Sequence, residues 1–134
     1  MEKTYHGSCH CGAVRYQARL DLAEGTGRCN CTYCSKIRNW SASAKDFELL
    51  QGEAALGDYA KDWGEGNIHH RFCSRCGVTV YGHGYIAEAG GAFVSVQVNT
   101  LDDASIDELL AGPLRYANGL HDDWMNPPAD IRAM

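Results

Sequence analysis

Alternation between apolar and polar residues recurs along the chain and predicts a series of short β-strands. The clearest run is Ala13–Leu20, which places Val14 and Tyr16 on one face and Arg15 and Gln17 on the other. A repeat of two is the period of a strand with one buried face. Alternating or apolar runs predict six further strands: Trp40–Ala44, Asp46–Leu50, Asn67–Phe72, Val78–Tyr81, Ala92–Val98 and Leu114–Ala117.

Signals for helix are sparse. Ser105–Leu110 is the only segment that resembles a helical turn, because it begins with a capping residue. The glycine-rich, acidic stretch Gly52–Gly66 predicts a long connection, and the tail from Asp122 predicts an end that frays or docks on the body. The patterns together predict a mainly β fold of small antiparallel sheets with long loops, in which residues 1–134 form a single domain.

Composition and charge narrow the class of protein. The 134 residues are 45% hydrophobic, and 17 acidic against 12 basic residues give a net charge of −5. This balance disfavours a protein that binds nucleic acid through a basic face. Met1–His6 lacks the apolar core of a signal peptide, and no run approaches the roughly 20 apolar residues of a membrane span. We therefore expect a cytoplasmic protein without membrane or nucleic-acid partners.

The cysteines change this picture, because all seven fall into short clusters. Thiols stay reduced in the cytoplasm, and an odd number would leave one unpaired, so the clusters predict metal ligands rather than disulfides. Glycines flank the first and last clusters and allow the tight turns that paired ligands need. The clusters hold two, three and two thiols: Cys9 and Cys11; Cys29, Cys31 and Cys34; Cys73 and Cys76.

The number of ligands predicts two different zinc sites. Structural zinc takes four protein ligands, whereas catalytic zinc usually takes three and leaves one position open. The two outer pairs therefore predict one closed structural site that ties the N-terminus to the middle of the chain. The central triplet predicts a second, unsaturated site at which chemistry can occur.

Two other arrangements remain open at this point. The triplet can share ligands with either outer pair, or it can take a histidine as its fourth ligand, which would make a closed structural site. The histidines available for that role are His6, His10, His69, His70, His83 and His121. None of these histidines, nor Tyr33 within the triplet, is marked by its spacing as a general acid or base.

Three thiolates favour sulfur chemistry over water activation. Their negative charge makes zinc a poor activator of water and a good host for a soft sulfur ligand. A small-molecule thiol bound there would be kept deprotonated and ready to attack a carbonyl. The excess negative charge would need nearby cations, and Arg28, Lys36 and Arg38 are the candidates. The same three side chains can bind carboxylates of the thiol compound.

The cysteine motifs, read together with their neighbours, resemble those of the glutathione-dependent formaldehyde-activating family, also called the centromere-protein-V-like domain. A combined CxC, CxCxxC and CxxCG pattern is far more specific than any one of its parts. The matching stretches follow the family's order and span most of the chain: Gly7–Tyr16, Cys29–Lys36, Phe72–Val78 and Val96–Asp103.

The resemblance implies a zinc-pinned β-tent fold and two Zn²⁺ ions. It implies a structural ion on the outer pairs and a second ion on the triplet, which binds the thiol of glutathione. The implied activity is that of a carbon–sulfur lyase run in reverse, which condenses glutathione with formaldehyde to S-hydroxymethylglutathione. The alternative is a non-catalytic, zinc-stabilised interaction module that docks a protein through Gly52–Gly66, with Tyr59 and Trp63 as anchors.

Overall fold

Two sheets make up most of the fold. The computed structural model describes residues 1–62 and 67–134. The smaller sheet is antiparallel, and its strands, in spatial order, are β1 (Lys3–Ser8), β2 (Arg15–Leu20) and β5 (Asp46–Gln51). The larger sheet has the spatial order β10 (Leu114–Ala117), β3 (Thr26–Cys29), β4 (Ser41–Ser43), β9 (Gly91–Gln97), β8 (Thr79–Ile86), β7 (Asn67–Cys73) and β6 (Leu56–Asp62).

Helices are short and lie between strands. The α-helices are α1 (Thr32–Ile37) and α2 (Ile106–Leu109), and the second has the predicted capping box between Ser105 and Glu108. Single 3-10 turns occupy Leu22–Glu24, Glu53–Ala55, Ala87–Ala89, Val98–Thr100 and Gly119–His121. No helix of the described residues is long and apolar enough to cross a membrane.

The core lies between the two sheets and follows from the alternation in the sequence. In β2, Tyr16 and Leu20 are fully buried, whereas Arg15 and Arg19 are exposed. Burying side chains of this size stabilises the fold by about 1.5–3 kcal/mol each. The ring of Phe47 on β5 joins the sheets, because its centroid lies 5.3 Å from that of Tyr16 and 4.4 Å from that of Tyr81 on β8.

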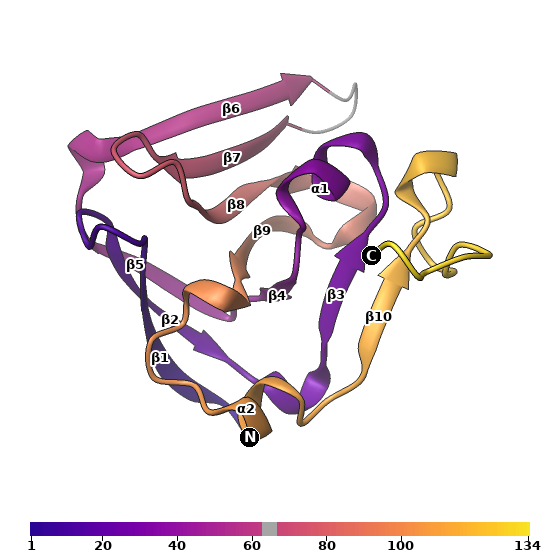
Figure 1. The fold of residues 1–134 in the computed structure, drawn as a ribbon, viewed down its shortest axis with the longest axis horizontal. Coiled ribbons are helices and arrows are strands. Elements are labelled where there is room, and N and C mark those ends of the chain that lie inside the picture. The colour runs from indigo at the N-terminus through magenta and orange to yellow at the C-terminus, as the bar shows by residue number, and fades with distance from the viewer. Residues whose placement is uncertain (63–66) are drawn as a thin grey trace.

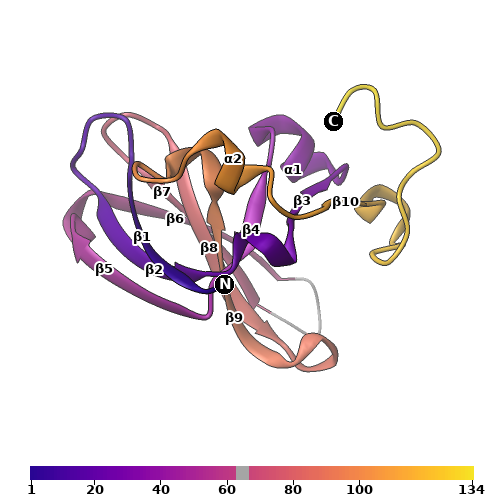
Figure 2. The same ribbon diagram turned by 90° about the horizontal axis from the view of Figure 1, so that it is seen from below.

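The prediction of a mainly β protein built from antiparallel sheets is confirmed, with one pairing of a different kind. β10 pairs with β3 in parallel, with Ala117 opposite Cys29. This pairing brings the C-terminal part of the chain to the edge of the larger sheet. In both ribbon views the C-terminal segment lies beside β10, β3 and α1 (Figures 1 and 2).

Several predicted boundaries need correction. The stretch Gly52–Gly66 was expected to be a connection, but Leu56–Asp62 forms β6, which pairs with β7 along its whole length; residues 63–66, including Trp63, lie outside the described part. Strands β1 and β3 and helix α1 were not predicted. Local periodicity gives little signal in these segments, and pairing with another strand or a metal-ligand turn decides their structure.

Candidate metal centres

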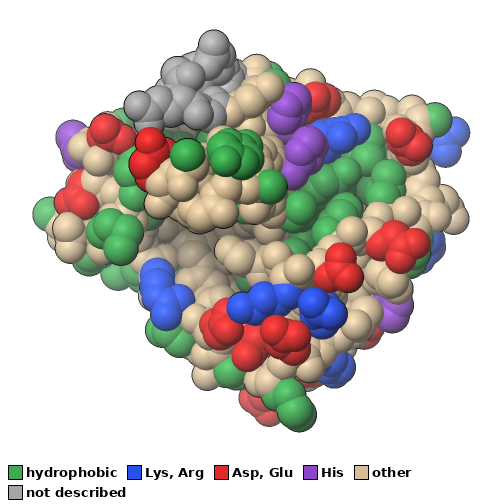
Figure 3. Space-filling model, turned by 180° about the vertical axis from the view of Figure 1, so that it is seen from behind, with side chains coloured by type: hydrophobic (Ala, Val, Ile, Leu, Met, Phe, Trp, Pro, Cys, Tyr) green, Lys and Arg blue, Asp and Glu red, His purple; other side chains and the backbone are tan. Residues whose placement is uncertain are grey.

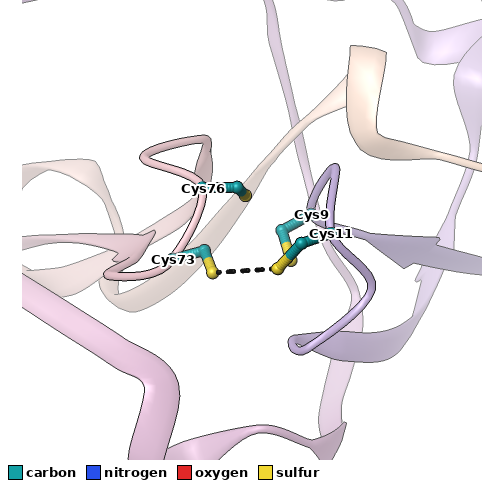
Figure 4. Close-up of side chains that lie close together, drawn as sticks. All are labelled: Cys9, Cys11, Cys73 and Cys76. Carbon is teal, nitrogen blue, oxygen red and sulfur yellow. Dashed lines mark hydrogen bonds between the residues drawn. The ribbon is translucent and has the colours of Figure 1, made fainter.

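The outer cysteine pairs come together as one four-sulfur cluster. Each pair sits on a turn, and the two turns face each other (Figure 4). The Sγ atom of Cys11 lies 3.7 Å from those of Cys9 and Cys73, and all four sulfurs, including that of Cys76, lie within 4.8 Å of one another. A tetrahedral zinc with bonds of about 2.3 Å would hold its sulfurs about 3.8 Å apart. The geometry therefore fits one tetracoordinate ion.

Matching backbone turns hold the two halves of this cluster. The amide of Cys9 donates to the carbonyl of Val14, and the amide of Cys73 donates in the same way to that of Val78. Each turn passes through a glycine with positive φ, +80° at Gly12 and +78° at residue 77, a conformation that other L-residues adopt only with strain. The cluster thus rests on local turns that pre-form each ligand pair.

Burial and charge also favour a bound cation at the four-sulfur cluster. Cys9 and Cys73 are buried, and Cys73 has no exposed surface. Amide hydrogen bonds from residues 11 and 78 lower the pKa of Cys76 to about 6. Thiolates crowded in a partly buried site need a cation for compensation, and soft sulfur donors select zinc or a similar ion.

The central triplet forms a second cluster, with its three sulfurs also within 4.8 Å of one another. Cys29 ends β3, Cys31 is the N-cap of α1, and Cys34 lies in the first turn of that helix. The amide of Cys34 donates to Sγ of Cys31 at 3.3 Å, and the amide of Cys31 donates to Sγ of Cys29 at 3.4 Å. The start of the helix therefore points backbone donors at the sulfurs of Cys29 and Cys31.

Two cysteines of the triplet, Cys29 and Cys34, differ in their affinity for a proton. A hydrogen bond from the Cys34 thiol lowers the pKa of Cys29 to about 5, with further help from the amides of Cys31 and Gly119. The same shared proton, followed by burial, raises the pKa of Cys34. A bound metal ion would keep all three sulfurs deprotonated.

None of the described histidines joins the triplet, so the arrangement with three cysteines and one histidine is not formed within residues 1–62 and 67–134. Nδ1 of His69 and a carboxylate oxygen of Asp58 form a hydrogen bond of 2.8 Å. The ring of His69 also stacks on that of His83, with the two centroids 4.8 Å apart. The rings of His70 and Tyr33 pack edge to face, with their centroids 3.9 Å apart. On the face opposite to that of Figure 1, histidine side chains lie beside an apolar area (Figure 3).

The three predicted cationic residues, Arg28, Lys36 and Arg38, line different hollows of the surface. Arg28 and Arg38 line a small niche together with Cys29 and Cys34. Lys36 lines a larger polar hollow of about 750 Å³, to which Arg38 also contributes. Arg38 therefore stands between the triplet and the polar hollow.

The local structure holds the side chain of Arg28 and the backbone of Arg38 in defined positions. The guanidinium of Arg28 lies 5.2 Å from the ring centroid of Trp40 and donates to the carbonyl of Asn39 at 3.4 Å. Arg38 ends α1 in the left-handed region, with φ at 54°, a conformation that a non-glycine residue adopts at some energetic cost. The side chain of Arg28 is thus held near the sulfurs by two contacts, whereas the exposed side chain of Arg38 is placed there only by the end of α1.

A wall of the triplet comes from residues 117–120, which follow the predicted strand Leu114–Ala117 and precede the tail from Asp122. Asn30, between two ligands, makes three hydrogen bonds to it, with the carbonyl of Ala117, the side-chain oxygen of Asn118 and the amide of Leu120. A Cβ added at Gly119 would lie 2.6 Å from Sγ of Cys29 and 2.6 Å from the ring of Trp124. The backbone therefore passes directly over Cys29, and a glycine is required there.

The fold and the two clusters define a class: a mainly β protein with one four-cysteine and one three-cysteine cluster, each of which could hold a metal ion. The chain belongs to the family described as glutathione-dependent formaldehyde-activating enzyme (GFA), whose model matches residues 4–113. The chain is also similar to the crystal structure of a protein from Rhodobacter sphaeroides, with 25% sequence identity and a TM-score of 0.66. That similarity covers 84% of this chain and 99% of the other.

Proposed function

We propose that the triplet is a catalytic zinc site at which a small-molecule thiol, glutathione being the first candidate, adds to formaldehyde. The observation that carries the proposal is the contrast in ligand number. Among the described residues, four sulfurs gather at the outer cluster, whereas no fourth cysteine, histidine or carboxylate joins Cys29, Cys31 and Cys34. Membership of the GFA family supports the same activity.

The donor set fits zinc, because thiolate sulfur is a preferred ligand of that ion. Zinc on three thiolates would supply one open position that favours a thiolate over water. The residues of the chain supply orientation and charge. Arg28 and Arg38 offset the negative charge of the sulfurs and can bind a carboxylate of the thiol compound.

The reaction itself is an addition. The sulfur of the thiol forms a bond to the carbonyl carbon, the π electrons of the C=O bond move to oxygen, and that oxygen takes up the proton that the thiol lost. The product is an S-hydroxymethyl thioether, and the reverse reaction breaks the same carbon–sulfur bond. A carbon–sulfur lyase is the matching reaction class.

Thiol binding and turnover test this proposal together. Protein carrying Co²⁺ in place of zinc should change its visible spectrum when glutathione is added, and S-hydroxymethylglutathione should form faster with the enzyme than without it. Cys34→Ser protein should show neither effect. Catalysis without any spectral change on thiol addition would contradict the assignment of the triplet as the thiol site.

A further inference from the structure

A hollow of about 540 Å³ lies next to the triplet, and most of its walls are apolar. Cys29 and Arg28 line both this hollow and the niche that contains Cys34. Apolar walls come from β10 and from the segment after it, including Tyr116, Trp124 and Pro127. We refer to it as the apolar hollow. Its volume falls in the range of small-molecule sites, about 300–1,000 Å³.

Large apolar side chains are exposed to solvent around this hollow. Trp124 is 54% exposed, Met125 is 90% exposed and Leu114 is 36% exposed. Such a cluster on one surface marks a binding site more often than scattered apolar residues do. The match to the GFA family model ends at residue 113, so these side chains lie outside the matched range.

The walls of the apolar hollow are fixed relative to the triplet. Ala117 pairs directly with Cys29 in the parallel β10–β3 ladder. Trp124 is held by a 2.7 Å hydrogen bond from its indole Nε1 to Asp122 and by its packing against Gly119. A pre-formed wall of this kind binds an apolar group without first having to be ordered.

The two sides of the triplet differ in chemistry. Arg38 faces both the niche and the polar hollow that Lys36 lines, so the charged parts of a thiol compound have their partners on that side. Cys29 faces the apolar hollow on the other side, whose lining is mostly apolar although Arg28 and Arg115 also contribute to it. Formaldehyde, whose carbonyl carbon carries only hydrogen, would leave this second hollow unused.

We propose that the apolar hollow binds the hydrocarbon substituent of a larger aldehyde, so that the chain acts on adducts of a thiol with alkyl or aryl aldehydes. The inference rests on the proposed function and extends its substrate class. The sulfur of the thiol forms a bond to the carbonyl carbon, the carbonyl oxygen gains the π electrons and the thiol's proton, and the product is a hemithioacetal. The substituent of the aldehyde lies against Trp124, with Ala117 at the floor.

Binding of unreactive product analogues tests the inference without turnover. S-hexylglutathione and S-methylglutathione carry the same thiol portion, and their thioether bonds do not break under these conditions. Calorimetric titration of the zinc-loaded protein should give at least tenfold tighter binding of the hexyl compound, because each buried methylene adds to affinity. Trp124→Ala should reduce this ratio about fivefold or more, and Trp124→Phe should restore most of it.

Two further variants distinguish a change in the apolar hollow from a general folding defect. Ala117→Leu fills the hollow instead of opening it and should also lower the hexyl-to-methyl ratio, with circular dichroism and zinc content as checks of folding. Ile106→Ala is the matched control, since Ile106 is 73% exposed and belongs to α2. It should keep the ratio of the wild-type protein.

The outcomes separate the inference from the function on which it rests. Equal affinity for the two analogues, in protein that still makes S-hydroxymethylglutathione, overturns the apolar hollow as a substrate site and leaves the proposed function standing. Failure of both analogues to bind, together with absence of any thiol-dependent turnover, overturns both. A ratio that Ile106→Ala lowers as much as Trp124→Ala does also overturns the assignment.

Discussion

The two cysteine clusters use the same side chain but are held by the chain in opposite ways. The four-sulfur cluster joins turns that lie 62 residues apart between Cys11 and Cys73, and two of its cysteines are buried. The triplet takes all its ligands from six consecutive residues, Cys29–Cys34, and each of its cysteines is partly exposed. A metal ion on the four-sulfur cluster would close a long loop of the chain, whereas one on the triplet would close only a very short loop.

The distance along the chain between the ligands decides whether a metal bound by cysteines would stabilise the fold. A metal that closes a long loop stabilises the fold, because the unfolded chain loses conformational freedom that the folded chain has already given up. A metal held within one helix turn and its preceding strand contributes little of this kind. Exchange of a ligand on such a metal would leave the fold in place, as the proposed function of the triplet requires.

The largest expected effect is that of Cys73→Ser. Loss of one buried ligand should release the ion, and structural zinc contributes on the order of 10 kcal/mol to folding, against a typical domain stability of about 5–15 kcal/mol. We expect loss of the cooperative thermal transition and of the β-sheet signal in circular dichroism. A melting temperature close to that of the wild-type protein would remove the structural role from the outer cluster.

Cys34→Ser is the matched substitution in the triplet, and it should separate activity from stability. Thiol-dependent turnover should fall at least 100-fold, because removal of a ligand disrupts the metal centre. The melting temperature should change by only a few degrees, as about 1 kcal/mol does in a domain of this size. Thermal unfolding followed by circular dichroism and an assay for S-hydroxymethylglutathione measure the two effects. Unfolding as severe as that of Cys73→Ser would break the contrast between the clusters.

Metal removal should proceed in two steps if the clusters differ as described. A mild chelator should remove one zinc equivalent from the triplet, which has one protein ligand fewer, while the circular dichroism spectrum keeps its shape. A stronger chelator should then remove the second equivalent together with the fold. Zinc release measured with a colorimetric indicator, alongside circular dichroism on the same sample, follows both steps; simultaneous release of two equivalents would contradict this order.

A smaller effect is expected for the cations beside the triplet. Arg28→Ala or Arg38→Ala should weaken glutathione binding about three- to tenfold, since charge-assisted hydrogen bonds contribute about 1.5–3 kcal/mol and an exposed site loses part of that. The loss should shrink as salt is added. Arg19→Ala, on the smaller sheet, is the control and should bind glutathione like the wild-type protein. Equal effects at all three positions would indicate a non-specific charge effect.

The sequence predicted the positions of several strands well. Strand β10 has its predicted range, and β2, β5, β7 and β9 came close to theirs. In β2 the burial also alternates along the strand, as the pattern predicts. The pattern cannot show which strands pair, so the parallel β10–β3 contact was missed. Strand β6 was hidden by glycines and acidic residues, whose low β-propensity is overcome by pairing with β7.

The site was predictable as far as ligand chemistry alone determines it. The grouping of the cysteines into four and three follows from number and spacing, and the structure brings the same sulfurs together. The contribution of Gly119 and Trp124 was not predictable, because no motif links residues near position 30 with residues near position 120. Their proximity depends on a β-ladder between segments about ninety residues apart in sequence.

The parallel contact between β10 and β3 has a consequence for the order in which the protein is made. Once residue 76 has left the ribosome, every ligand of the outer cluster has been synthesised. The hydrogen bonds to Asn30 and the backbone over Cys29 need residues 117–120, which are translated some forty residues later. A nascent chain can thus assemble the four-sulfur cluster while the triplet still lacks one of its walls.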